Sequence, residues 1–367
     1  MKQIQQDQAK NPLARRLGRY ALRALLVLFT TVLLVFIGLC VILNTIFNGP
    51  STAARDILTM TMLESSGMKW CPAIFIGKET VEQIQAGVSA TLPGDVSVSD
   101  QVVIRPNDTA ADSEWADYPD GIRIDTISGD SYNAYVMLIR DPSAVYMAVS
   151  SDNFSMSIPG ERITNQIVKE GAIAAINAGA FYDNGKASAE VGSVPEGLVV
   201  AQGTVRWTAG QAPQTGFVGF NQDNILVVAK TMTAEKAQEL KIRDGCCFGP
   251  VLIMDGNVNE EAYNANSGWN PRTAIGQRAD GTVIFVCIDG RQAGSLGADY
   301  GDIIDIMTEY GAVNACNLDG GSSTVMLYKD TFGRYGTAGE ICMINNYSLL
   351  QEMPRRMPTF FMVRPGK

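Results

Sequence analysis

The chain of 367 residues contains no histidine. This absence excludes Ser-His-Asp and Cys-His catalysis, zinc sites with histidine ligands and phosphohistidine intermediates. An acid, a base or a nucleophile must therefore come from aspartate, glutamate, cysteine, tyrosine, lysine or a hydroxyl group.

Cysteine patterns typical of metal sites are also missing. The seven cysteines contain no Cys-x-x-Cys pair, which excludes a zinc ribbon. Cys287 and Cys316 lie in apolar, strand-like runs and are expected to be buried thiols. A disulfide that involves Cys246, Cys247 or Cys342 is an open alternative in an oxidising compartment.

Positive charge is scarce beyond the N-terminus. The first 23 residues carry six basic side chains and one acidic side chain, a net charge of +5, whereas the whole chain carries −9. The remainder therefore carries −14. Because nucleic-acid binding requires a basic surface, this acidic remainder argues against a nucleic-acid partner.

Residues 24–43 form an apolar run of 20 uncharged residues, enough for a helix of about 30 Å. The basic side chains precede this run, which places the N-terminus in the cytoplasm. A cleaved signal peptide, the alternative, has a shorter apolar run of about 7–15 residues. We therefore predict a single-pass cell-membrane protein with a cytoplasmic basic tail over 1–23, a transmembrane helix over 24–43 and an extracellular remainder.

The remainder divides into two regions. Residues 51–66 have the apolar spacing of a helix, so we predict a juxtamembrane helix followed by an acidic linker over 44–120. Residues 91–120, rich in Asp, Ser and Pro, are either this linker or an irregular acidic insertion. Over 121–367, short β-rich runs alternate with helical patterns and glycine-rich turns. This texture predicts one α+β domain, a mixed twisted sheet with flanking helices.

Polar residues follow several predicted strands. Strands over 283–288 and 313–318 are joined by a predicted helix, and such a crossover makes the two strands parallel. Asp289 and Asp319, which follow these strands, should therefore emerge at one sheet edge, where ligands bind in open α/β sheets. Asn177 ends another predicted strand and could join them.

The second of these strands leads into a glycine-rich turn. Its residues with possible binding roles are Asn317, Asp319, Gly320, Gly321, Ser322 and Ser323. Two glycines allow positive φ angles and close approach of the backbone, and successive backbone N–H groups can bind an anion. A carboxylate beside such a turn predicts chemistry on a phosphate or a sugar.

Several spaced motifs point to one family. They are Asn177-Ala178-Gly179-Ala180-Phe181-Tyr182, Pro195-Glu196-Gly197-Leu198, Phe248-Gly249-Pro250, Asn270-Pro271-Arg272-Thr273, Asp289-Gly290-Arg291 and the segment from Asn317 to Thr324. Their order resembles that of the phosphodiester glycosidase family, which includes N-acetylglucosamine-1-phosphodiester α-N-acetylglucosaminidases. The resemblance covers residues 121–365 and leaves out the apolar run. A membrane-anchored version resembles bacterial members linked to exopolysaccharide metabolism.

The resemblance implies cleavage of a sugar-1-phosphodiester at the anomeric C1–O bond, in extracellular polysaccharide or cell-envelope glycan metabolism. Such a reaction needs a cradle for the phosphate charge and a carboxylate near the anomeric carbon. Arg272 and Arg291 suit the phosphate, because a guanidinium fork matches two phosphate oxygens. Asp319 is our first choice for nucleophile or base, with Asp289 as its partner.

Other roles stay open at this point. Glu190 and Glu196 are additional carboxylates of lower rank. We expect no required cofactor, although the oxygen atoms of Asp289, Asp319 and Asn177 would also suit Ca²⁺ or Mg²⁺. The alternative functions are a non-catalytic glycan-binding or assembly module at the cell surface and a metal-dependent phosphodiesterase that cleaves the P–O bond.

Overall fold

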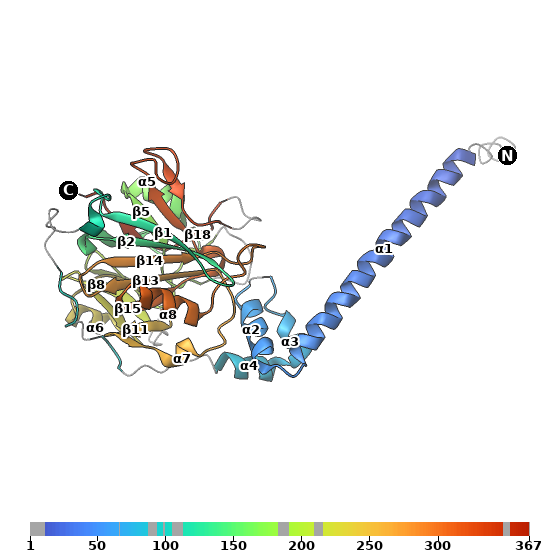
Figure 1. Cartoon of the computed structure of the whole chain (residues 1–367), viewed down its shortest axis with the longest axis horizontal. Helices are drawn as coiled ribbons and strands as arrows, with labels where there is room; N and C mark the ends of the chain where they lie inside the picture. Colours follow the sequence, from blue (N-terminus) through green and yellow to red (C-terminus); the bar gives the residue numbers. More distant parts are fainter. Residues whose placement is uncertain are drawn as a thin grey trace.

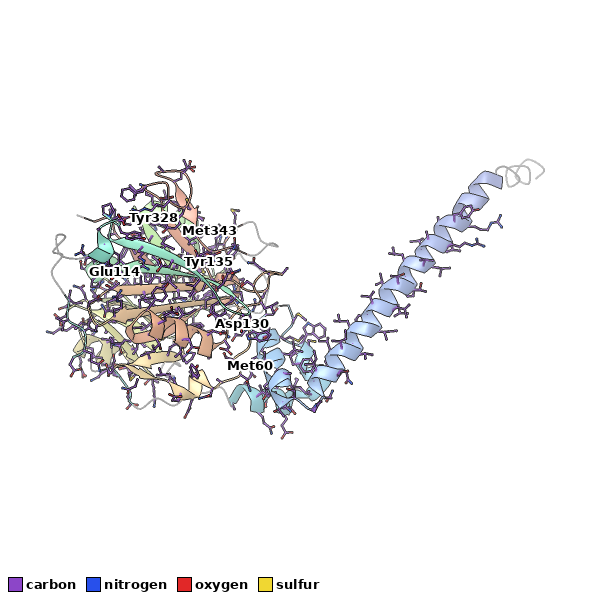
Figure 2. All side chains as sticks on the ribbon, in the orientation of Figure 1. Met60, Glu114, Asp130, Tyr135, Tyr328 and Met343 are labelled. Carbon is purple, nitrogen blue, oxygen red and sulfur yellow. The ribbon has the colours of Figure 1, made fainter. Side chains whose placement is uncertain are left out.

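A computed structural model describes residues 12–65, 67–86, 94–97, 100–104, 113–182, 191–208, 216–347 and 353–366. A long helix, α1 (Pro12–Phe47), projects from a body of sheets and helices (Figure 1). Within the described chain, α1 is the helix long and apolar enough to cross a membrane, over Gly18–Phe47. Its side chains stand clear of the body along most of its length (Figure 2).

The largest sheet positions the polar strand ends. Its strand order is β1 (Ile122–Ser128), β2 (Asn133–Ile139), β14 (Val283–Ile288), β13 (Arg272–Arg278), β15 (Ala312–Leu318), β11 (Val251–Met254) and β12 (Asn257–Val258). β13 pairs antiparallel with both β14 and β15, so these two strands run parallel to each other but are not neighbours. The carboxyl ends of β14 and β15 therefore flank the start of β13, as the predicted crossover required, with one strand inserted between them.

Two smaller antiparallel sheets complete the body. One has the order β7 (Thr204–Thr208), β6 (Leu198–Ala201), β10 (Ile242–Cys247), β8 (Phe217–Asn221) and β9 (Leu226–Ala229). The other has the order β17 (Ile341–Met343), β16 (Met326–Lys329), β5 (Ala174–Asn177), β19 (Thr359–Val363) and β3 (Val145–Val149). A short pair joins β18 (Arg356–Met357) to β4 (Glu161–Arg162).

The three larger sheets share one apolar core, and a helix covers the outer face of each. α8 (Tyr300–Glu309) covers the seven-stranded sheet, α5 (Ile163–Glu170) the sheet with β5, and α6 (Ala234–Glu239) the sheet with β8. β14 illustrates why both faces of a sheet are covered. Its side chains are all apolar and point alternately to the shared core and to α8, as the two-residue period of a strand requires. The remaining short elements are α7 (Glu260–Tyr263) and the 3₁₀ turns Ser113–Trp115, Pro142–Ala144 and Gly321–Ser323. The α+β class is confirmed.

Three helices follow α1 directly and form what we call the three-helix unit: α2 (Thr52–Leu63), α3 (Cys71–Ile76) and α4 (Lys78–Ala86). The predicted helix over 51–66 corresponds to α2, which the Ser51 hydroxyl caps by accepting from the Ala54 amide at 3.2 Å. Phe47 at the end of α1 stacks on Phe75 with ring centroids 5.2 Å apart. The unit is therefore packed onto the end of α1.

The expected linker is wrong for the described parts of 91–120, because they pack on the body. The Ser97 hydroxyl accepts from the Val228 amide at 3.1 Å, and Glu114 forms ion pairs with Arg123 and Arg278. Trp115 is buried in the cluster beneath α8. The folded body thus begins before residue 121. All seven cysteines are thiols, and Cys287 and Cys316 are buried as expected.

Trp115→Ala tests whether this segment belongs to the body. Because the indole is 5 % exposed and packs against the α8 cluster, we expect the free energy of unfolding to fall by about 3–5 kcal/mol. Urea unfolding in detergent micelles measures this, with the exposed neighbour Ala116→Ser as the control. A loss as small as that of the control would mean that the segment is only loosely attached.

Candidate functional site

A pocket lies where the three-helix unit meets the edge of the seven-stranded sheet. Its volume is about 310 Å³, within the range of small-molecule sites. The sheet edge and its turn contribute Arg272 at the start of β13, Asn317, Asp319, Gly320, Gly321 and Ser322. Other parts of the body contribute Phe181, Phe248, Tyr300 and Arg355. The three-helix unit contributes Leu63 and Glu64 at the end of α2 and Lys69 between α2 and α3. Several predicted residues are thus brought together with others that the sequence did not suggest.

Asp319 follows β15 and is held by β5 of a different sheet. Its amide donates to the Ala178 carbonyl at 3.0 Å, and the Asn177 side-chain amide donates to the Asp319 carbonyl. The Asn177 oxygen accepts from the Thr273 hydroxyl at 2.8 Å and from the Val325 amide at 3.2 Å. Asn177 is fully buried and engaged with the protein, so it lies behind Asp319 and holds its backbone rather than lining the pocket.

The environment of Asp319 raises its pKa to about 6. Burial is the main cause, because it disfavours the charged form. The Ser323 hydroxyl, the Arg355 guanidinium and the Gly320 amide oppose this shift, and the negative charge of Glu64 adds to it. A carboxylate with a pKa near the working pH is suited to accept and return protons.

The glycine turn brings the backbone close to β13 but offers fewer amides than the sequence suggests. A Cβ on Gly320 would lie 2.6 Å from the Pro271 carbonyl oxygen, and Gly321 has a φ of +61°. The amide of Gly321 donates to the Pro271 carbonyl at 2.8 Å, and the amide of Ser323 donates to the Gly320 carbonyl at 3.0 Å. These two amides are engaged within the protein, which limits the predicted anion cradle. Ser322 accepts from Arg355 Nη1 at 3.3 Å.

Arg272 is buried, and its guanidinium fork is already occupied. Nε donates to the Ala298 carbonyl at 3.1 Å, and Nη2 donates to the carbonyls of Ser267 and Gly268, each at 2.9 Å. Nη1 faces Glu64 of the three-helix unit at 3.0 Å, and the guanidinium lies 4.6 Å from the ring centre of Tyr300. The expected two-pronged phosphate clamp is therefore not available at Arg272.

Arg291 lies at the rim beside the glycine turn. Its side chain is exposed, and Nη2 donates to the Asn270 side-chain oxygen at 2.8 Å. A Cβ on Gly321 would lie 3.3 Å from Arg291 Nη1. An anion that enters the pocket beside Gly321 would therefore meet this guanidinium.

Asp289 reaches the same sheet edge as Asp319 but does not line the pocket. Its Oδ2 accepts from the Tyr135 hydroxyl at 3.2 Å and from the Asn346 side-chain amide at 2.9 Å. Burial raises its pKa, and hydrogen bonds from Asn346 and Tyr135 oppose that shift. Its Oδ1 is buried and has no hydrogen-bond partner among the described residues. Because Asp289 does not line the pocket, the expected pairing of Asp289 with Asp319 around one ligand is not present there.

Three further predicted residues have different environments. Asn317 is buried, its Nδ2 donates to the Gly249 carbonyl at 2.9 Å, and its Oδ1 has no hydrogen-bond partner among the described residues. Glu196 is half-buried outside the pocket, with its amide bonded to the Ala180 carbonyl at 2.9 Å. Glu190 lies outside the described residues.

Sequence reasoning missed Glu64, Lys69 and Arg355. The first two lie in the region assigned to a juxtamembrane helix and linker, and no local pattern signals that this region meets the sheet edge. Arg355, which lies 4.7 Å from the ring centre of Phe181, precedes the buried strand β19; a basic pair before an apolar strand is a signal that could have been used.

The pocket combines three cationic side chains with two acidic ones, a net charge of +1 when all are ionised. The cations are Lys69, Arg272 and Arg355, and the acids are Glu64 and Asp319. Across the described chain, no three Cys, Asp or Glu side chains come together as a metal site would require. The arrangement suits a singly charged anionic group next to a carboxylate.

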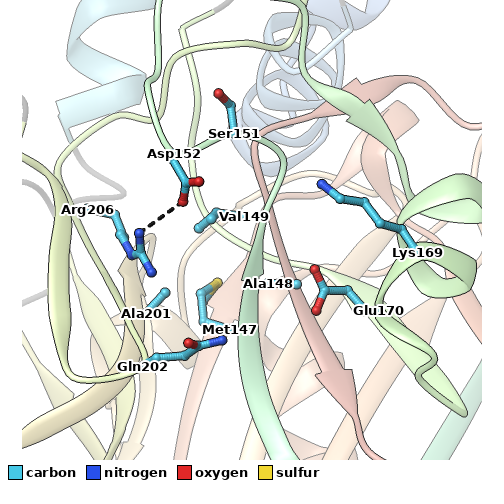
Figure 3. A pocket seen from close by; sticks show the side chains of 10 residues that line it. All are labelled: Met147, Ala148, Val149, Ser151, Asp152, Lys169, Glu170, Ala201, Gln202 and Arg206. Carbon is cyan, nitrogen blue, oxygen red and sulfur yellow. Dashed lines mark hydrogen bonds and ion pairs between the residues drawn. The ribbon is translucent and has the colours of Figure 1, made fainter.

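A second pocket lies between β3, the end of α5 and the hairpin of β6 and β7 (Figure 3). Its volume is about 190 Å³, below the usual size of a ligand site, and it contains none of the predicted site residues. Arg206 and Asp152 form an ion pair across it at 3.0 Å. We therefore place the candidate site at Asp319.

Comparisons with known proteins find a matching family profile, a related sequence and a similar fold. The sequence profile of the phosphodiester glycosidase family matches residues 170–364, which include Asp319, Arg272 and Arg355. The chain is 26% identical over 191 residues to the SPbeta prophage-derived protein YomE of Bacillus subtilis (strain 168), a match that covers 50% of this chain and 27% of that protein. The chain thus spans about a quarter of that relative's length.

A solved structure shows a similar fold. It is the catalytic domain of zebrafish N-acetylglucosamine-1-phosphodiester α-N-acetylglucosaminidase, auto-inhibited by its pro-peptide. The TM-score is 0.51 at 19% sequence identity, with 67% of this chain and 82% of that chain covered. At this identity the likeness concerns the fold alone.

Glu64→Gln tests the electrostatic link between the three-helix unit and Arg272. Burial is the largest single influence and lowers the pKa of Arg272, but Glu64, Tyr300 and Asp299 together outweigh it, and the net direction is upward. Loss of this carboxylate should reduce the free energy of unfolding by about 1–3 kcal/mol, less than for a fully buried pair because Glu64 is 29% exposed. Urea unfolding measures the change, with the exposed Glu82→Gln on α4 as the matched control. Equal values for the two variants would show that Arg272 does not need Glu64.

Proposed function

Because this chain belongs to the phosphodiester glycosidase family, we propose that it hydrolyses a sugar-1-phosphodiester at the bond between the anomeric carbon and the phosphate oxygen. The observation that carries the proposal is Asp319: a carboxylate with a pKa of about 6 in a pocket that also holds three cationic side chains. Glycosidases need a carboxylate at the anomeric carbon, and phosphate departure needs positive charge.

Asp319 acts in its ionised form. Either it attacks C1 directly, or it takes a proton from the water that attacks C1. In both cases the C1–O bond breaks and its electron pair leaves with the phosphate oxygen. The products, after water has added at C1, are a free sugar and a phosphate monoester. Phosphate is a good leaving group, so this scheme needs no second carboxylate as a strong acid.

The phosphate is proposed to bind at the cationic side of the pocket. Arg355 and Lys69 line it, and Arg291 stands at the rim beside Gly321. Arg272 contributes its charge from behind, because its donors already meet three carbonyls and Glu64. A phosphodiester carries one negative charge, which matches the net charge of the pocket.

The sugar is proposed to bind at the remaining wall. The unpartnered Oδ1 of Asn317 is an acceptor for a sugar hydroxyl, since a buried polar atom without a hydrogen bond is costly. Phe181, Phe248 and Tyr300 line the same pocket and can pack on an apolar sugar face. Asp289 is then a supporting residue that fixes Tyr135 and Asn346.

We also propose where the reaction takes place. α1 would anchor the chain in the cell membrane with its basic tail in the cytoplasm and the body outside. The substrate would then be an extracellular polysaccharide or another cell-envelope glycan. No cofactor is proposed, because arginine and lysine side chains supply the positive charge.

Asp319→Asn should abolish turnover while strengthening the fold above pH 6. A raised pKa means that the folded state prefers the protonated group, so stability from this preference is present at low pH and lost as pH rises through about 6. Asparagine removes that loss, and we expect a gain of about 1–3 kcal/mol at pH 8 and almost none below pH 4. Urea unfolding at both pH values measures it, with the exposed Asp223→Asn as the control.

The same residue sets the pH dependence of the wild-type enzyme. Because the ionised form is the active one, kcat/KM should rise about tenfold per pH unit below pH 6 and level off above it. A rate that instead falls above pH 6 would give Asp319 the role of an acid. Unchanged turnover in Asp319→Asn would remove it from the chemistry.

Hydrolysis in ¹⁸O-labelled water separates a glycosidase from a phosphodiesterase. A panel of sugar-1-phosphodiesters is incubated with the full chain, and both products are analysed by mass spectrometry. We expect the label on the sugar, because water adds to C1, and an unchanged rate after EDTA treatment, because side-chain cations serve the phosphate. Label on the phosphate together with EDTA sensitivity would indicate P–O cleavage by a metal enzyme. Binding of the panel without turnover would indicate a glycan-binding module.

A further inference from the structure

The three-helix unit carries an exposed apolar face that no part of the described body covers. Met68, Trp70 and Ile74 are 43, 64 and 67% exposed. Single exposed apolar side chains are ordinary on protein surfaces, but three large ones within seven residues form a patch. Trp70 is the N-cap residue of α3, and Ile74 lies on α3 four residues later, so the two side chains lie on one side of the helix.

The opposite side of α3 is fixed to α1. Cys71 is buried and Phe75 stacks on Phe47, the last residue of α1. Phe47 lies four residues, about one helical turn, beyond the apolar run that ends at residue 43. The exposed face of α3 is therefore held close to the level at which the apolar run of α1 ends.

From this placement we infer that Met68, Trp70 and Ile74 enter the bilayer at the boundary between headgroups and acyl chains, next to the end of α1. The inference rests on the proposed membrane anchor. Tryptophan is enriched at this boundary because its ring has an apolar body and a polar edge. The Trp70 ring N–H donates to the Gly67 carbonyl at 3.0 Å, so the indole can leave water without losing a hydrogen bond.

Lys69 connects this face to the candidate site, because it also lines the pocket of Asp319. Trp70, its neighbour in the chain, belongs to the proposed membrane face. The pocket wall formed by the three-helix unit is thus within one residue of the bilayer surface. Groups attached to the membrane would reach the pocket along this wall.

Tryptophan quenching tests the contact directly. The chain has four tryptophans, Trp70, Trp115, Trp207 and Trp269, and none lies in α1. The full chain is reconstituted into phosphatidylglycerol–phosphatidylethanolamine vesicles whose acyl chains carry bromine near the headgroup. We expect quenching of roughly a quarter of the emission, the share of one tryptophan in four, relative to unbrominated vesicles.

Two matched pairs of variants identify the residue. Trp70→Phe should lose the quenching, whereas Trp269→Phe, in which a 38% exposed indole of the body is replaced, should keep it. Ile74→Asp should reduce the quenching of Trp70, because a charged side chain on the apolar face disfavours its entry into the bilayer. Val168→Asp, at a 65% exposed position on α5, should leave the quenching unchanged. Equal quenching in wild type and Trp70→Phe would overturn the inference. Flotation of the same vesicles tests the membrane anchor α1 separately from the apolar face of α3. A protein that does not float with the vesicles would contradict the membrane span itself.

Discussion

The buried guanidinium of Arg272 is the constraint on which the site depends. A charge taken out of water is stable only when its donors are bonded and an opposite charge lies close. Here the donors are met by carbonyls of two loops, by the ring of Tyr300 and by the carboxylate of Glu64. The start of α8, the loop before β13 and the end of α2 therefore cannot separate without leaving this charge unbalanced.

A glycine makes this close assembly possible. Gly268 has a φ of +76°, and a Cβ there would lie 2.6 Å from the backbone nitrogen of Thr61 on α2. The Thr61 hydroxyl also accepts from the Trp269 amide at 3.1 Å. The helix and the loop touch backbone to backbone at this point, which brings Glu64 within reach of Arg272. The three-helix unit is thus part of the site.

Local patterns predicted much of the sheet and its polar edge. The continuous apolar run of β14, the helical period of α8 and the crossover rule placed Asp289 and Asp319 at one edge. The insertion of β13 between their strands has no local signal, because it depends on pairing between segments distant in the chain. The same limit applies to Glu64, whose partner Arg272 is 208 residues away. Residue type alone also overestimated the capacity of Arg272 to bind a phosphate, since the sequence does not show how many of its hydrogen-bond donors the fold already uses.

The connection between α1 and the rest of the chain is very short. Residues 48–51 separate α1 from α2, and Phe47 is packed within the three-helix unit. A long flexible linker would let the pocket move through a volume that grows with the length of the linker. The short connection between α1 and α2 does not allow such movement. With the function and the membrane anchor proposed above, the pocket would meet substrate groups only at one height above the bilayer. On a long envelope polymer, the length of the uncut stub would then record that height, and the rate would follow the number of polymer chains per area of membrane.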